Sequence, residues 1–180
     1  MPLLMLIGGA RSGKSSLALV LAGAQGEPVV FVATATAGDA DMAARIARHR
    51  DERPQEWETI EEPIDLAGAL AAASAQACVV VDCLTLWVAN LMEAGLDAPE
   101  VALRSAEAAR IAAARPGWTI AVSNEVGLGV VPATPLGREY RDLLGRVNAA
   151  WAAVADDMLL VVAGRTLRLG PAPASLDALS

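Results

Sequence analysis

The chain has 180 residues and a formal net charge of −7, which suits a single domain with a substantial core and argues against a protein that neutralises nucleic-acid phosphates over a broad face. Apolar residues make up 54% of the sequence and aromatic residues only 3%, so we expect an aliphatic, helix-rich core. The longest apolar stretch, 78–92, contains Asp82 and is too short to cross a bilayer, so we do not expect an integral membrane protein. Cys78 and Cys83 fit neither a zinc site nor a C-x-x-C redox site, which favours free thiols and a cytoplasmic location.

An apolar run at 3–7, expected to form a strand, leads into a glycine-rich turn and then into an expected helix from residue 16. The turn satisfies the pattern G-x-x-x-x-G-K-[ST] in the context that a phosphate cradle requires. Lys14 would reach the terminal phosphates, and Ser15 would supply a hydroxyl to Mg²⁺. Lys14 is the single lysine beside thirteen arginines, which indicates that a compact ammonium is needed there and weakens the alternative of a chance match. The residues expected to hold the phosphates are Gly8, Gly9, Ala10, Arg11, Ser12, Gly13, Lys14 and Ser15.

A buried second strand is expected at 29–33, and the residues that follow it are Thr34, Ala35 and Thr36. In a parallel sheet these residues would lie at the carboxyl edge, where open α/β folds bind their ligands. A helix capped by Asp39 or Asp41 is expected through 42–50.

The only histidine of the chain, His49, lies in this expected helix. Helical spacing places it on one face with Met42, Ile46 and Arg53, so we expect it to point toward the protein body. Taken alone, a histidine on an inward face is more often a packed core residue than a functional one. Arginines at 45, 48, 50 and 53 would offset the charge of a triphosphate, although at least one of them is expected on a solvated face.

Two further strands are expected at 57–60 and 78–82, with a helix at 64–75 between them. The second strand ends on Asp82. A carboxylate at the end of a buried strand is costly unless it meets a cation, and beside a phosphate loop the expected cation is Mg²⁺. The alternative is that Asp82 caps the helix expected at 84–92, and the two roles can coexist.

The rest of the chain continues the alternation of strands and helices. We expect helices at 100–114 and 136–156, a strand at 118–122, and a hairpin formed by 158–163 and 166–169. The pattern predicts a single α/β domain over 1–170, with a mostly parallel sheet flanked by helices and a C-terminal antiparallel hairpin strand. Residues 171–180 lack periodicity and are expected to form a loose tail.

Four segments beyond the phosphate loop narrow the function. They are 42–46 with 49–54, 81–85, 124–132 and 145–148. In this order and spacing the set resembles the bifunctional adenosylcobinamide kinase and adenosylcobinamide-phosphate guanylyltransferase family of cobalamin biosynthesis, over nearly the whole chain from Leu4 to about Leu169. The phosphate loop is generic, whereas the segments around His49 and at 124–132 are specific to that family.

The resemblance implies a RecA-like P-loop NTPase fold, a homo-oligomer (a trimer by that resemblance) and two reactions on a corrinoid substrate. In the first, ATP or GTP phosphorylates the cobinamide hydroxyl. In the second, GTP gives its GMP moiety to that phosphate through a guanylyl-histidine, with His49 as the nucleophile. Carried over residue by residue, the nucleotide site would comprise the phosphate loop with Thr34, Ala35, Thr36, Arg50, Asp51, Glu52, Arg53, Glu61 and Asp82. The chain departs from some members in having Arg48 where they have a second histidine, and Asp82 where they have glutamate.

Three questions stay open in the sequence. In a RecA-like order the strand at 118–122 would lie between the phosphate-loop strand and the Asp82 strand, bringing Asn124 and Glu125 near the phosphates. Glu125 would then be a catalytic residue that orients or deprotonates the attacking hydroxyl, or it would only pin the glycine loop. A kinase of another small molecule without guanylyl transfer is an alternative function. A RecA-like, ATP-driven nucleic-acid-binding module is another, disfavoured by the acidic balance and the lack of an arginine and aromatic groove.

Overall fold

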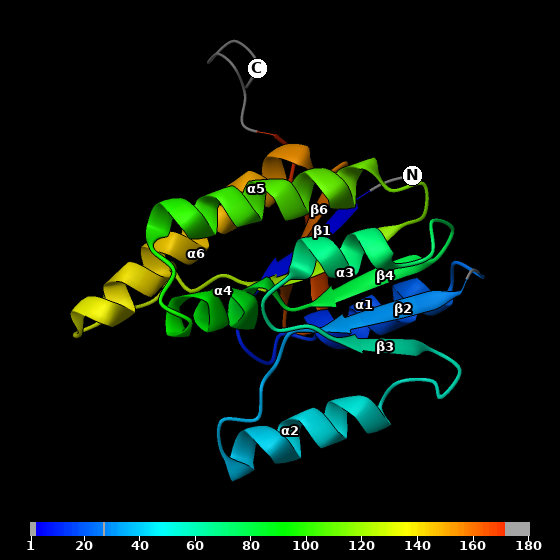
Figure 1. Ribbon diagram of the computed structural model, residues 1–180, viewed down its shortest axis with the longest axis horizontal. Coiled ribbons are helices and arrows are strands. Elements are labelled where there is room, and N and C mark those ends of the chain that lie inside the picture. Colours follow the sequence, from blue (N-terminus) through cyan, green and yellow to red (C-terminus); the bar gives the residue numbers. More distant parts are fainter. Residues whose placement is uncertain (1–2, 27, 172–180) are drawn as a thin grey trace.

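The computed structural model describes residues 3–26 and 28–171 (Figure 1). Strands and helices alternate through most of the chain, and a two-strand hairpin closes it. The elements are β1 (Leu3–Gly8), α1 (Lys14–Gly23), β2 (Val29–Ala33), α2 (Ala40–Asp51), β3 (Glu58–Glu61), α3 (Leu66–Ala72), β4 (Cys78–Asp82), α4 (Leu84–Glu93), α5 (Ala98–Ala114), β5 (Thr119–Asn124), α6 (Pro135–Val154), β6 (Asp157–Val162) and β7 (Arg165–Arg168).

The strands form one seven-stranded sheet in the order β3-β2-β4-β5-β1-β6-β7. Neighbouring strands are parallel except for the β6–β7 hairpin, which is antiparallel. The predicted mostly parallel sheet with a C-terminal antiparallel strand is therefore confirmed. Strand β5 lies between β1 and β4, as the RecA-like order requires. The expected loose tail lies outside the described residues, apart from Pro171.

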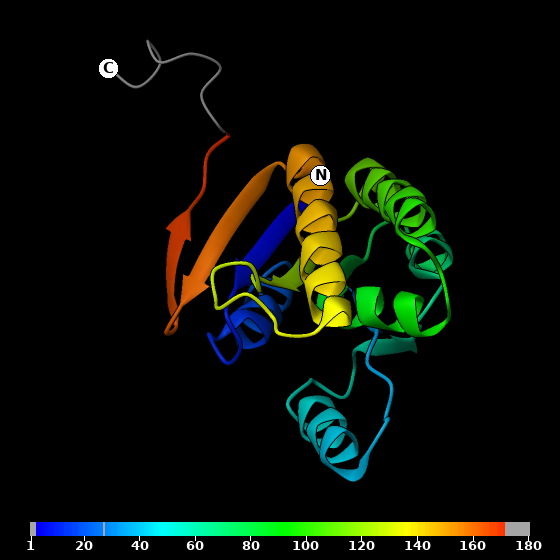
Figure 2. The ribbon, with the colours of Figure 1, turned by 90° about the vertical axis from the view of Figure 1, so that its left-hand side faces the viewer.

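Alternate residues of the buried strands supply two cores, one on each face of the sheet. Met5, Val32 and Val81 belong to the larger core, which α3, α4, α5 and α6 cover. Leu6 and Val80 belong to the smaller one, which packs against α1. Figure 2 shows the same arrangement from the side, with α2 standing apart from both helix layers. Strands buried on both faces read as continuous apolar runs, which is why 3–7 and 78–81 contain no polar residue.

Three helices begin or end away from the predicted residues, and side-chain caps account for two of them. Helix α1 begins at Lys14, two residues before the predicted start, and its N-cap Gly13 has a left-handed backbone conformation that favours glycine. Helix α5 begins at Ala98 instead of the predicted residue 100, because Asp97 and Glu100 form a capping box. Helix α3 is shorter than the predicted 64–75, because Asp65 caps its start and the chain is extended again from Ala73. Within the described ranges, no helix combines the length and apolar character needed to cross a membrane.

Candidate functional site

The carboxyl ends of four neighbouring strands bring the predicted site residues to one edge of the sheet. In the strand registers, Ala33 on β2 is level with Asp82 on β4, and Asp82 is level with Val122 on β5. Gly8 at the end of β1 is level with Asn124 at the end of β5. The sequence prediction that the phosphate loop, Thr34, Asp82 and the Asn124–Glu125 tip share this edge is confirmed.

The phosphate loop connects β1 to α1, and the ammonium group of Lys14 lies across it. Lys14 Nζ donates to the carbonyl oxygens of Gly8 at 2.9 Å and Gly9 at 2.7 Å, and to Ser12 Oγ at 3.3 Å. Burial lowers the pKa of Lys14, and the nearby Cys83 and Asp82 partly offset that effect. Gly8 has no room for a side chain, since a Cβ there would collide with the carbonyl oxygen of Val161 on β6. The loop therefore holds a cation in place at the start of a helix, which suits a bound anion.

Asp82 ends β4 next to the phosphate loop. Burial raises the pKa of its carboxyl group, while the Ser15 side chain and the charges of His49, Arg53 and Lys14 lower it. The N-cap of α4 is Cys83, without a side-chain cap bond, so the alternative in which Asp82 caps this helix is wrong. A carboxylate beside a hydroxyl is a fitting oxygen donor set for Mg²⁺.

The described residues contain no group of three or more His, Cys, Asp or Glu side chains that could hold a metal ion. A Mg²⁺ bound by Ser15 and Asp82 would therefore draw its remaining ligands from phosphate oxygens and water, which is how Mg²⁺ is usually held in kinase sites. The donor set present fits the cation predicted from the sequence.

Thr34 joins the ends of β2 and β4 and is fully buried. Its Oγ1 donates to the carbonyl oxygen of Cys83 and accepts from the Cys83 N–H, both at 2.8 Å. A residue that the sequence analysis missed, Asn90 on α4, donates from Nδ2 to the Thr34 carbonyl oxygen at 2.7 Å. The signal for Asn90 was the one amide side chain within the mostly apolar helix α4. Ala35 is half-buried and Thr36 is exposed, so the chain leaves the body at this point.

His49 lies on the least exposed face of α2, together with Met42, Ile46 and Arg53. These four side chains are half-buried, whereas every other described side chain of 40–52 is exposed. The predicted shared face is confirmed, but the prediction that it points into the protein body is corrected. Helix α2 lies away from the sheet layers, so its apolar face is only half-buried (Figure 2). His49 is nevertheless close enough to Asp82 for its charged form to lower the pKa of that carboxyl group.

Two arginines fasten the C-terminal end of α2 to the sheet. Arg50 forms an ion pair with Glu61 at the end of β3, and the Arg53 guanidinium lies 3.7 Å from the ring centroid of Phe31 on β2. Burial lowers the pKa of Arg53, and its Nε is buried without a hydrogen-bond partner. Glu61, Arg50 and Arg53 are thus brought together as predicted. Asp51 and Glu52, also predicted to line the nucleotide site, are exposed.

The tip after β5 is held against the phosphate loop. The Glu125 N–H donates to the Gly8 carbonyl oxygen at 3.0 Å, and the Gly127 N–H donates to Glu125 Oε1 at 2.6 Å. Asn148 on α6 donates from Nδ2 to the Asn124 carbonyl oxygen at 3.0 Å. The tip is therefore near the phosphate cradle, and the Glu125 carboxylate orders its own loop.

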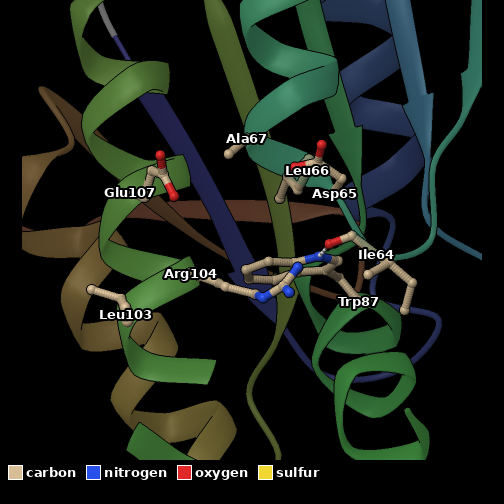
Figure 3. A pocket seen from close by; sticks show the side chains of 8 residues that line it. All are labelled: Ile64, Asp65, Leu66, Ala67, Trp87, Leu103, Arg104 and Glu107. Atoms are coloured by element: carbon tan, nitrogen blue, oxygen red, sulfur yellow. Dashed lines mark hydrogen bonds between the residues drawn. The ribbon is translucent and has the colours of Figure 1, made fainter. Parts of the chain in front are cut away.

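A pocket of about 270 Å³ lies elsewhere, between α3, α4 and α5. Trp87 of α4 is part of its wall, and its indole Nε1 donates to the Ile64 carbonyl oxygen at 2.9 Å. Figure 3 shows the eight side chains that surround this pocket, none of which belongs to the predicted nucleotide site. Its lining residues are Ile64, Asp65, Leu66, Ala67, Trp87, Leu103, Arg104 and Glu107.

The sequence matches one family model over nearly the whole chain. The model describes cobinamide kinase / cobinamide phosphate guanyltransferase and matches residues 4–169. The chain is 45% identical over 171 residues to the bifunctional adenosylcobalamin biosynthesis protein CobP of Pseudomonas aeruginosa, covering 94% of this chain and 98% of that protein. It is 38% identical over 175 residues to the bifunctional adenosylcobalamin biosynthesis protein CobU of Escherichia coli K12, covering 90% and 96% of the two chains.

Among solved structures, a protein of Pyrococcus horikoshii OT3 is similar with a TM-score of 0.58 at 8% identity, covering 96% of this chain and 88% of that one. This likeness concerns the fold alone.

Proposed function

Because the chain belongs to the cobinamide kinase / cobinamide phosphate guanyltransferase family, we propose that it is a transferase that phosphorylates adenosylcobinamide and then converts the phosphate into adenosylcobinamide-GDP. The observation that supports the proposal is geometric. The phosphate loop and Asp82 lie at one edge of the sheet, and Arg50 and Arg53 hold the end of the segment that carries His49 against neighbouring strands of that sheet. We propose that the groups for phosphate binding and the histidine nucleophile serve a single site.

In the first reaction, the cobinamide hydroxyl attacks the γ-phosphorus of ATP or GTP and loses its proton, and the nucleoside diphosphate leaves. Lys14 and the N–H groups of the phosphate loop bind the phosphates and offset the charge that spreads over the transferred group. Ser15 and Asp82 would hold Mg²⁺, which would offset negative charge on the phosphates. Glu125 stands beside this cradle, where it either receives the hydroxyl proton or only holds the loop.

In the second reaction, an unprotonated imidazole nitrogen of His49 attacks the α-phosphorus of GTP. The bond from that phosphorus to the bridging oxygen breaks, and pyrophosphate leaves. A phosphate oxygen of cobinamide phosphate then displaces the imidazole from the α-phosphorus, which gives the GDP derivative and frees His49. Arg50 and Arg53 offset negative charge on the triphosphate, while Thr34 to Thr36, Asp51, Glu52 and Glu61 complete the nucleotide site in this proposal.

Assembly and location form part of the same proposal. We propose a homo-oligomer, a trimer, working in the cytoplasm, with a corrinoid and a nucleoside triphosphate as its small-molecule ligands and no nucleic acid. Two features support contact with another copy of the chain. One is the half-buried face of α2. The other is the set of exposed apolar side chains beyond the β5 tip, Leu128, Val130 and Val131. The net charge of −7 supports the absence of a nucleic-acid partner.

The test is covalent labelling with α-labelled GTP and Mg²⁺. Wild type should take up one GMP per reactive chain, in a phosphoramidate that is stable to base and labile to acid, unlike a phosphate ester on Ser15 or Thr34. His49→Ala and His49→Asn should take up no label and should still phosphorylate adenosylcobinamide. Lys14→Ala should lose both reactions, since both triphosphates need the loop.

Two outcomes would contradict the proposal. Label that persists in the His49 variants would show that another residue is the nucleophile. Wild type that phosphorylates cobinamide normally but takes up no GMP would be a kinase without guanylyl transfer.

A further inference from the structure

One excursion of the chain carries α2 away from both helix layers (Figure 2), and His49 lies within it. It leaves at Thr34, directly after β2, passes through α2, and returns through β3, which ends at Glu61 (Figure 1). Strands β2 and β3 are parallel neighbours, and Ala33 is level with Glu61. The start of the excursion at Thr34 and its end at Pro63 are therefore close together at the carboxyl edge of the sheet.

Asn90 of α4 binds both ends of this excursion at once. Its Nδ2 donates to the carbonyl oxygens of Thr34 at 2.7 Å and Pro63 at 3.2 Å. Its Oδ1 accepts a longer hydrogen bond from Thr36 Oγ1 at 3.4 Å. The Asn90 side chain is only 9% exposed, and its bond to Thr34 is buried, whereas those to Pro63 and Thr36 are partly buried. One amide thus connects the segment that follows β2 with the segment that follows β3, and α2 lies between these two segments in the chain.

The neighbouring turn of α4 acts on the same returning segment. Trp87, three residues before Asn90, donates from its indole Nε1 to the Ile64 carbonyl oxygen at 2.9 Å, and Figure 3 shows these two residues together. Residues three apart lie on one face of a helix. That face of α4 therefore holds 63–64 in place, and Asn90 extends the hold to the segment that leads into α2.

Helix α2 depends on such ties because it lacks a place in either core. Its described side chains are exposed or half-buried. Its C-terminal end is held by the Arg50–Glu61 ion pair, whose partners are more than half exposed, and by Arg53, just beyond the helix, which lies over the Phe31 ring. Exposed ion pairs contribute little to fixing a position. The buried amide of Asn90 is a stronger constraint, because breaking it leaves carbonyl oxygens without partners away from water.

We propose that Asn90 is a positioning residue for guanylyl transfer: it fixes the point at which the chain leaves the sheet toward α2, and thereby holds His49 in position to attack the nucleotide. This inference rests on the proposed guanylyl-histidine. Within the described residues, Asn90 hydrogen-bonds to Thr34, Thr36 and Pro63 and makes no hydrogen bond to the phosphate loop. Lys14 and Ser15, which serve phosphoryl transfer, lie on α1. Asp82 ends β4, where its carbonyl oxygen accepts the Thr34 N–H at 3.2 Å, a backbone bond that the Asn90 variants retain. The two reactions should therefore respond differently to its loss, whereas a residue that only stabilises the fold would affect both alike.

Asn90→Asp is the most informative variant, because it keeps the size of the side chain and replaces the donating NH₂ group with oxygen. The rate of GMP transfer to His49 from α-labelled GTP and the rate of adenosylcobinamide phosphorylation are measured in the same preparations. We expect the first rate to fall roughly tenfold relative to the second, as the loss of buried hydrogen bonds predicts. Asn90→Ser, which is smaller and uncharged, is expected to shift the ratio in the same direction and serves if the aspartate variant does not fold.

Trypsin provides a readout that does not depend on activity. Cleavage after the arginines of α2 under native conditions should be several-fold faster in the Asn90 variants than in wild type, since a loosened helix opens more often. Tyr140→Phe is the matched control. It removes a different hydrogen bond to α4, from Tyr140 Oη to the Thr85 carbonyl oxygen at 3.2 Å, and should change neither the rate ratio nor cleavage in α2.

An unchanged rate ratio and an unchanged cleavage rate in folded Asn90→Asp or Asn90→Ser would overturn the inference while leaving the proposed function intact. Equal loss of both reactions would also overturn it. If wild type takes up no GMP, the guanylyl-histidine itself fails, and the role of Asn90 fails with it.

Discussion

The Glu125 carboxylate is already engaged within its own loop. Its Oε1 accepts the Gly127 N–H in a short hydrogen bond of 2.6 Å. A Cβ on Gly127 would approach the same oxygen to 2.8 Å, so the turn is built around this contact. The backbone N–H of Glu125 in turn donates to Gly8 of the phosphate loop. These contacts favour the structural role among the two that the sequence left open.

Glu125→Gln separates the two roles. Glutamine keeps an oxygen that can accept the Gly127 N–H but cannot take up a proton at neutral pH. We expect the phosphorylation rate of Glu125→Gln to stay within about threefold of wild type, and Glu125→Ala to lose more because its loop is no longer pinned. Steady-state kinetics across pH would check this. A fall of a hundredfold or more in Glu125→Gln, with the loss of one limb of the pH profile, would establish Glu125 as the base.

At the scale of elements, one buried arginine joins two helices to the sheet. Arg115, the C-cap of α5, donates to the carbonyl oxygens of Leu70 and Ala73 from Nη1 and to those of Ser74 and Ala77 from Nη2, at 2.7–3.2 Å. The guanidinium therefore satisfies the carbonyl groups that the end of α3 and the turn before β4 leave open. Its charge lies at the carbonyl end of α3, where the helix dipole favours a cation.

Arg115→Ala should lower the free energy of unfolding by about 2–4 kcal/mol, because it removes the shared donor of several buried carbonyl groups. Arg115→Lys should recover only part of this loss, since an ammonium lacks the planar fork. Urea denaturation would measure both. The control is Arg104→Ala, an exposed arginine on the same helix, which should change stability by less than about 0.5 kcal/mol. A urea midpoint of Arg115→Ala equal to that of wild type would contradict the proposed role of Arg115 as the shared donor to these carbonyl groups.

The elements show what could be predicted from sequence and what could not. The spacing of Met42, Ile46 and His49 correctly predicted their shared face, because helical periodicity is local. It did not reveal that α2 stands apart from the core, because periodicity defines a face and not the partner of that face. Asn90 was missed for a related reason: its partners at Thr34 and Pro63 are 56 and 27 residues away. The RecA-like strand order that the family resemblance implied, by contrast, correctly placed the tip at Asn124 beside Gly8.

At the scale of the whole molecule, the fold places the residues proposed for phosphoryl transfer at one edge of the sheet. Four helices cover one face of the sheet, α1 covers the other, and the predicted site lies at the carboxyl edge between them (Figures 1 and 2). The sequence contains a single match to the phosphate-loop pattern, at residues 8–15. We therefore propose that both reactions use one triphosphate site beside Asp82, with His49 on α2 serving the second.

This architecture predicts that the triphosphates of the two reactions exclude one another. A non-hydrolysable ATP analogue should raise the GTP concentration needed for half-maximal labelling of His49 and leave the final extent of labelling unchanged. At ten times its own dissociation constant, a purely competitive analogue raises that concentration roughly elevenfold. His49→Ala is the control for binding: it takes up no label, but the analogue should raise its thermal unfolding midpoint as much as that of wild type, since Lys14 and the loop are intact. Labelling kinetics that do not respond to saturating analogue would show that GTP reaches His49 from a second nucleotide site, away from the phosphate loop.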